Sequence, residues 1–276
     1  MVNSFGSLLL ANGRLGLEPF LRGGWQALGW VVGETVINLS TVAATFFLAT
    51  RFDSIGGWGV NDLYFMLGFV LVARGVANVF SGRNVLMISR KIARGQLDHV
   101  LTQPLPLWKA LAAEGFSPFD LAVTLALGIG VLIATVPNSS ASPSVYWYVI
   151  LALNLAASVI VVVSYQYMWG SLAFYAPRGA EEVNTTSFSV TNSLSGYPLD
   201  ATPLPVKGIL LSIIPVGFIG WLPSRSLLYE PVGFGPWLTP VFSIILALLT
   251  VFVFRKGLKR YAHIGSGRYS DWGHRR

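Results

Sequence analysis

The chain has 276 residues, of which 53% are hydrophobic and 11% are charged, whereas soluble domains carry roughly 25% charged residues. This composition excludes an ordinary soluble globule, because so much apolar surface cannot be hidden in a core of this size. Nineteen Lys and Arg residues against twelve Asp and Glu residues give a net charge of +7. The lack of cysteine excludes disulfides, a cysteine zinc site and a thiol nucleophile.

Residues 1–24 precede the first long apolar stretch and combine leucines with Arg14, Glu18 and Arg22. They lack the long apolar core and small-residue cleavage site of a signal peptide. We expect an amphipathic lead-in helix that lies in the membrane interface.

Six apolar stretches are candidates for membrane spans, since a helix needs about 20 residues to cross the hydrocarbon core. The fifth is the weakest, because it is short and contains Pro215, so a helix that is broken or stops partway across is the alternative there. We predict an all-α membrane protein with six transmembrane helices in a single domain, residues 1–276; a large soluble helical protein is the disfavoured alternative. The spans cover residues 25–49, 62–80, 119–136, 145–174, 206–219 and 237–254.

Two ionisable residues fall inside these spans, Glu34 in the first and Arg74 in the second. At about 1.5 Å rise per residue, both lie roughly 12–14 Å from the cytoplasmic face. An unpaired charge facing lipid is costly, so we predict an intramembrane ion pair that clamps the first two helices together. A direct part in a substrate path and no contact at all are the alternatives.

The first inside loop, residues 81–114, carries apolar residues at helical spacing, among them Ile88, Ile92 and Leu97. This pattern predicts an amphipathic helix, which Pro104 and Pro106 end. Its basic face could contact lipid headgroups or a partner protein.

Three further segments are polar or interrupted. We expect residues 176–205, rich in Ser, Thr and Asn, to form a cytoplasmic helix and turn that cannot cross a bilayer. Residues 220–236 are expected either to dip into the outer leaflet as a broken segment before the last helix or to form a turn-rich loop. Residues 255–276 form a basic cytoplasmic tail.

The basic residues alternate between loops. With both termini in the cytoplasm, the inside segments hold sixteen Lys and Arg residues and the outside loops hold two, Arg51 and Arg225. Cytoplasmic loops collect such residues, so we predict a multi-pass protein with both termini cytoplasmic. A nucleic-acid binder would gather them on one folded basic domain, so we expect no nucleic-acid partner.

Motifs for chemistry are missing from the sequence. The three histidines, His99, His263 and His274, are not paired with carboxylates at zinc-binding spacing, and there is no phosphate-binding G-x-x-x-x-G-K-[S/T] loop. We therefore expect no catalytic residue, no metal site and no bound cofactor, so that the chain is not an enzyme by itself.

The segment ARGQLDHVLTQPLP, residues 93–106, resembles the R-x-G-x-[L/F]-[D/E]-x-x-L-x-x-P-L motif of ABC-2 type permeases. The resemblance continues over residues 195–228 and 257–267, and is closest to the six-helix branch of viologen-exporter-like permeases. It implies the permease subunit of an ATP-driven exporter in a bacterial cytoplasmic membrane. Such a subunit pairs with a second permease chain, identical or paralogous, and with two cytoplasmic ATPase subunits that bind ATP and Mg²⁺.

The resemblance also implies that residues around 90–101 form a coupling helix that docks on the ATPase. The positions concerned are Arg90, Lys91, Arg94, Gly95, Asp98 and Leu101. The alternative is a surface helix held on anionic lipid by its basic residues. The apolar spans favour a hydrophobic or amphipathic cargo, and the nearest branch suggests a cationic one. An ATP-independent channel or scaffold is the competing function, and a lipid-modifying enzyme is a third.

Overall fold

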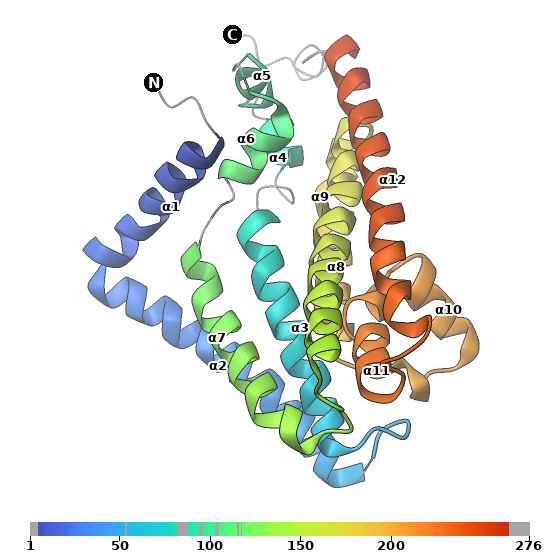
Figure 1. Cartoon of the computed structure of the whole chain (residues 1–276). Helices are drawn as coiled ribbons and strands as arrows, with labels where there is room; N and C mark the ends of the chain where they lie inside the picture. The colour runs from blue at the N-terminus through green and yellow to red at the C-terminus, as the bar shows by residue number, and fades with distance from the viewer. Residues whose placement is uncertain are drawn as a thin grey trace.

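The computed structural model describes residues 5–52, 54–81, 88–93, 96–102, 105–114, 116 and 118–264. Over these residues the chain is helical and has no sheet (Figure 1). The helices are α1 (Phe5–Arg22), α2 (Gly24–Phe52), α3 (Val60–Ser81), α4 (Ile88–Ala93), α5 (Gln96–Leu101), α6 (Leu107–Glu114), α7 (Pro118–Thr135), α8 (Val145–Gly170), α9 (Pro177–Leu194), α10 (Leu204–Ser212), α11 (Trp221–Tyr229) and α12 (Gly235–Ile264).

The bundle has two distinct ends. Helices α4, α5 and α6 lie at the end where α12 finishes, at the top of Figure 1, which we call the loop end. The turn before α3, together with α10 and α11, lies at the opposite end, which we call the far end. Four short 3-10 helices connect the longer elements: η1 (Val136–Asn138), η2 (Ser171–Phe174), η3 (Leu199–Ala201) and η4 (Val216–Phe218).

Three helices of the described chain are long and apolar enough to cross a membrane, over Val60–Val79, Val145–Phe174 and Gly235–His263. They confirm the predicted helices at 62–80 and 145–174. The last helix runs on to Ile264, so the first part of the predicted tail 255–276 is helical, and the rest of the tail lies outside the described residues.

Helices α2 and α7 occupy the predicted spans 25–49 and 119–136 and contain the shorter apolar segments Val31–Ser40 and Val123–Asn138. The predicted lead-in segment is helical as α1, and its place in the membrane interface stays a prediction.

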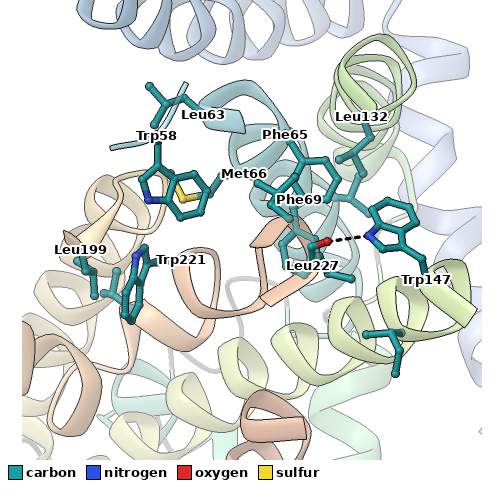
Figure 2. Close-up of a cluster of buried hydrophobic side chains, with 14 of the residues drawn as sticks. Trp58, Leu63, Phe65, Met66, Phe69, Leu132, Trp147, Leu199, Trp221 and Leu227 are labelled. Carbon is teal, nitrogen blue, oxygen red and sulfur yellow. Dashed lines mark hydrogen bonds between the residues drawn. The ribbon is translucent and has the colours of Figure 1, made fainter. Parts of the chain in front are cut away.

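Helix α3 is the centre of the bundle, because its side chains are buried on all sides; Phe65, Met66 and Phe69 have no exposed surface. On the far-end side it packs in a cluster that includes Trp147 of α8, whose indole N–H donates to the Leu227 carbonyl of α11 at 2.8 Å (Figure 2). This bond fixes the far-end helices to the membrane-spanning ones.

Helix α9 runs antiparallel to α3 and confirms the helix predicted within residues 176–205, but with the chain beyond it α9 extends along the bundle instead of staying at one end. Glu181 in its second turn meets α4 at the loop end, and Asn192 accepts a hydrogen bond from Arg74 of α3. The chain beyond it reaches the far end, where Asp200 contacts Trp58 just before α3. Since the 22 residues of α3 span about 33 Å, α9 and the segment after it traverse the whole bundle.

The sequence missed this traverse because α9 is polar. Asn184 and Thr191 are nonetheless buried, at 2% and 5% exposure, because α9 packs against protein rather than lipid. Polar and irregular backbone is tolerated at membrane depth where protein covers it.

The span predicted at 206–219 is not one continuous helix. Helix α10 ends at Ser212, and the short η4 follows Pro215, whose ring cannot continue a helix. At Gly220 the backbone passes so close to the Ser195 carbonyl that no side chain fits between them. The fifth predicted span is therefore a broken far-end segment, continued by α11, and Lys207 lies at the far end rather than with the basic residues of the loop end.

We expect Gly128→Ala to destabilise the bundle, because an added Cβ would lie 2.8 Å from the Val72 nitrogen where α7 crosses α3. Overpacking of this kind costs about 1–3 kcal/mol. Gly130 is the matched control in the same helix, since a Cβ there meets nothing within 4 Å. Thermal unfolding in detergent should show a lower midpoint for Gly128→Ala alone; equal midpoints for the two variants would contradict the close packing.

Candidate functional site

The short helices α4, α5 and α6 are packed onto the loop end of the bundle by a shared apolar cluster. Ile88, Leu97 and Leu111 of these helices have no exposed surface. Their apolar faces point into protein, where they meet η2, α9 and α12, rather than into a lipid surface. The buried members of the cluster are Ile88, Ile92, Leu97, Leu107, Leu111, Ala173, Phe174, Ala180, Phe254 and Tyr261.

Three polar contacts add to this cluster, and each joins a different pair of elements. The Asp98 carboxylate of α5 accepts a hydrogen bond from the Tyr261 hydroxyl of α12 at 2.8 Å. Arg90 of α4 pairs with Glu181 of α9 at 2.5 Å. Lys91 of α4 forms an ion pair with Glu114 of α6.

Among these contacts, the hydrogen bond from Tyr261 is the one that connects a short helix to a helix running the whole length of the bundle, α12. Tyr261 is 6% exposed, so the hydrogen bond lies at the edge of the apolar cluster, where water competes for it less than at an open surface. This hydrogen bond therefore connects α5 to α12 directly.

The predicted coupling helix is divided. Residues 88–101 form two short helices, α4 and α5, instead of one. Arg94 and Gly95, both predicted site residues, lie between them and outside the described residues. Leu101 ends α5 and is 37% exposed.

Burial of Lys91 argues against the lipid-bound alternative for this segment. Lys91 is 8% exposed and its ammonium group is paired with Glu114, so this group does not reach a layer of lipid headgroups. Arg90 is exposed but engaged by Glu181.

The sequence missed the three partners of these residues, Tyr261, Glu181 and Glu114. The two glutamates carry no pattern that distinguishes them from other loop residues. Tyr261 could have been noticed as an aromatic residue inside a basic run, GLKRYAHIG, where a solvated tail needs none.

A cavity of about 610 Å³ opens between α1 and the three short helices. Asn12 of α1 donates to the Ala113 carbonyl of α6 at 2.8 Å and holds α1 against one wall. Lys91, Gln96 and His99 supply polar groups to its lining.

Glu34 and Arg74 face the same region between α2 and α3, but each has a different hydrogen-bond partner. Glu34 accepts from Asn38 and from Thr124 of α7, both at 3.2 Å. Arg74 donates to the Asn192 carbonyl at 3.0 Å. The Glu34 charge still acts on Arg74 through space. The predicted ion pair that clamps α2 to α3 therefore stays a prediction.

The far end is held by a carboxylate network centred on Asp200. Its Oδ2 accepts from the indole N–H of Trp58 at 2.7 Å and of Trp221 at 2.6 Å; Figure 2 shows these two rings beside the buried cluster. Its Oδ1 lies 3.1 Å from Arg225 and 3.6 Å from Lys207. One carboxylate thus joins the turn before α3 to α10 and α11.

Asp62 makes a second latch at the same end. Buried at the start of α3, it accepts from the Ser140 backbone at 2.7 Å and from the Tyr229 hydroxyl of α11 at 2.8 Å. Two carboxylates therefore hold α11 against the connections between the spans.

Comparison with known families gives one finding. A profile of the family described as "ABC-2 family transporter protein" matches residues 36–265. No curated protein and no solved structure matches the chain.

A double-mutant cycle tests the hydrogen bond between α5 and α12. We expect Asp98→Ala and Tyr261→Phe each to lower the free energy of unfolding, and the double variant to lose less than the sum of the two. The coupling energy should be about 1–3 kcal/mol, as for a hydrogen bond to a charged group. Strictly additive losses in denaturation of the detergent-solubilised chain would show that the two side chains do not interact.

The Asp200 network makes stability depend on pH. Burial by itself raises the pKa of the Asp200 carboxyl, but hydrogen bonds from Trp221 and Trp58 outweigh it and, with the nearby cations, hold the pKa below its ordinary value. A lowered pKa stabilises the fold above the unfolded-state pKa of about 3.9, and that contribution is lost as the pH falls through the folded pKa.

We therefore expect Asp200→Asn to destabilise the chain at pH 7 by about 1–3 kcal/mol, and the difference from wild type to shrink as the pH is lowered from about 5 to 3. Glu230→Gln, at an exposed carboxylate of the same end, is the control and should change little. A difference that stays constant over this pH range would refute the assignment.

Proposed function

Because the chain belongs to the ABC-2 transporter family, we propose that it is the transmembrane permease subunit of an ATP-driven exporter. Permeases of this family generally pair with separate ABC ATPase subunits. In this proposal two such ATPases carry the ATP and Mg²⁺, and a second permease chain, identical or paralogous, completes the transporter.

The observation that carries the proposal is the attachment of α5 to α12 through Asp98 and Tyr261. A short helix that is held to a long one by a hydrogen bond and a shared apolar cluster moves with it as a unit. Closure of the ATPases against the loop end would push α4 and α5, and α12 would tilt in response. This is a hinge-type conversion of a partner's rigid-body motion.

The 610 Å³ cavity beside α5 supports the docking step. It lies at the same end as Asp98, and Gln96 and His99 of α5 line it. A segment of the ATPase that enters this cavity would contact α5 directly and transmit force without a further linker.

Alternating access also needs an outward side that is closed in one state. In this proposal the contacts that Asp200 and Asp62 make with α10 and α11 keep that side closed. Export then requires the movement of α12, which follows α11 directly in the chain, to loosen these contacts.

Charge supports an orientation with the loop end in the cytoplasm of a bacterial inner membrane, since cytoplasmic segments collect Lys and Arg. The described basic residues of α4, α6 and the last turns of α12 all lie at that end: Arg90, Lys91, Lys109, Arg255, Lys256, Lys259 and Arg260. Both termini are cytoplasmic in this orientation.

The second permease chain is expected on the side of α2. Val32, Val36 and Ile37 of this helix are more than half exposed, a surface suited to lipid or to a second chain. A cargo that passes between two such faces would be hydrophobic or amphipathic.

Co-purification from native membranes in a mild detergent tests the proposal. We expect an ABC ATPase subunit in about equal amount to permease chains, as this family's assembly implies, and ATP hydrolysis by the complex. Asp98→Ala should lower hydrolysis or the binding of the ATPase, whereas Glu230→Ala at the far end, the matched control, should leave both unchanged.

A chain that purifies alone and hydrolyses no ATP would instead favour the channel or scaffold. Equal ATPase activity in the Asp98→Ala and wild-type complexes would agree with a permease subunit but contradict a role of α5 in coupling.

A further inference from the structure

Arg74 stands between two cavities in the half of the bundle nearer the loop end. It lies seven residues before the end of α3, or about 10 Å along the helix. One cavity, of about 460 Å³, lies between α2, α3 and the end of α9, and includes Ser40 and Tyr197 in its lining. Arg74 and Asn192 line both cavities, so the guanidinium is accessible from the larger one.

The smaller cavity, of about 10 Å³, is surrounded by buried polar groups. The Tyr165 hydroxyl lies near the Trp169 indole N–H and the Ser187 side chain, and the Gln166 side-chain oxygen is inaccessible and has no hydrogen-bond partner among the described residues. Tyr165 and Gln166 are 2% and 3% exposed. Buried polar groups are nearly always hydrogen-bonded, so the unpaired oxygen beside Arg74 indicates a missing ligand or water.

The chemistry of this cluster favours an anion. A guanidinium has five N–H donors, and the described structure shows one of them donated, to the Asn192 carbonyl. The indole of Trp169 can only donate, and the hydroxyl of Tyr165 can donate as well. Glu34, whose charge acts on Arg74 through space, accepts hydrogen bonds from Asn38 and Thr124.

The surroundings favour an amphiphile over a soluble anion. Ala44, Leu67 and Val70 form apolar walls of the larger cavity, and the exposed apolar side chains of α2 lie beside it. A volume of about 460 Å³ suits a small headgroup, while an acyl chain can extend along α2 into the membrane.

We infer that this groove binds the phosphate or carboxylate headgroup of an anionic amphiphile through Arg74. The inference rests on the proposed function, since it assigns the class of cargo that the permease carries. It differs from the cationic cargo that the sequence resemblance suggests.

The test is equilibrium binding of radiolabelled lysophosphatidylglycerol to the full chain in nanodiscs of zwitterionic lipid. We expect unlabelled lysophosphatidylglycerol to compete at least tenfold better than lysophosphatidylcholine or dodecyltrimethylammonium. Arg74→Gln should weaken binding about tenfold to a hundredfold, as for loss of a charge-assisted hydrogen bond, and Arg74→Lys should retain part of it. Arg255→Gln, which removes an exposed arginine of α12, is the matched control and should bind as wild type does.

Tyr165→Phe keeps the inference falsifiable if Arg74→Gln fails to fold. It removes one hydroxyl beside Arg74 and leaves the ring in place, so the chain should fold while affinity falls about threefold. Unchanged affinity in both variants, or equal competition by the three headgroups, would overturn the inference. Displacement by inorganic phosphate alone would assign the site to a soluble anion and overturn the amphiphile.

These outcomes are independent of the ATPase, because the binding measurement uses the permease chain alone. A chain that binds the anionic amphiphile but recruits no ATPase would contradict the proposed function only. A complex that hydrolyses ATP but shows no headgroup preference would contradict the cargo class only.

Discussion

The structure depends on one constraint, that a polar helix and the irregular chain beyond it run along an apolar bundle from one end to the other. Helix α9 buries Ala180, Asn184 and Thr191 on one face, against α4, α8 and η2, and leaves Thr185, Thr186, Ser189 and Ser193 exposed on the other. The chain beyond α9 is irregular, and irregular backbone is tolerated at membrane depth where protein covers it. Gly220, packed against the Ser195 carbonyl, shows how closely the far-end segment must approach to achieve this.

Because α9 traverses the bundle, it meets each of the polar sites in turn. Near its start, Glu181 pairs with Arg90 of α4 at the loop end. Two residues before its end, Asn192 accepts a hydrogen bond from Arg74 beside the two cavities, and past its end Asp200 joins the far-end elements. In the proposed transport cycle, α9 therefore connects α4 to the Arg74 groove and to the far-end network, in parallel with the path from α5 to α12.

Much of the fold could be predicted from hydrophobic runs. The helices at 62–80, 145–174 and 237–254 are where their apolar length places them, and the motif around Asp98 led to the loop-end site. The polar composition of residues 176–205 led us to expect a segment confined to one end of the bundle. That expectation failed because the burial of Asn184 and Thr191 by other helices cannot be read from the segment itself. The span expected at 206–219 failed for the converse reason, since apolar residues around Pro215 pack at the far end without crossing. Partners such as Tyr261 depend on contacts between distant parts of the chain, which no local pattern encodes.

The traverse of α9 is open to direct measurement, because the chain contains no cysteine and single cysteines can be introduced without background. Glu182 and Ala201 are exposed positions on either side of the traverse. In intact cells, we expect a membrane-impermeant maleimide to label Ala201→Cys from outside and to label Glu182→Cys only after the membrane is permeabilised. Protection of both positions until permeabilisation would place residues 176–205 wholly in the cytoplasm and contradict the traverse on which the rest depends.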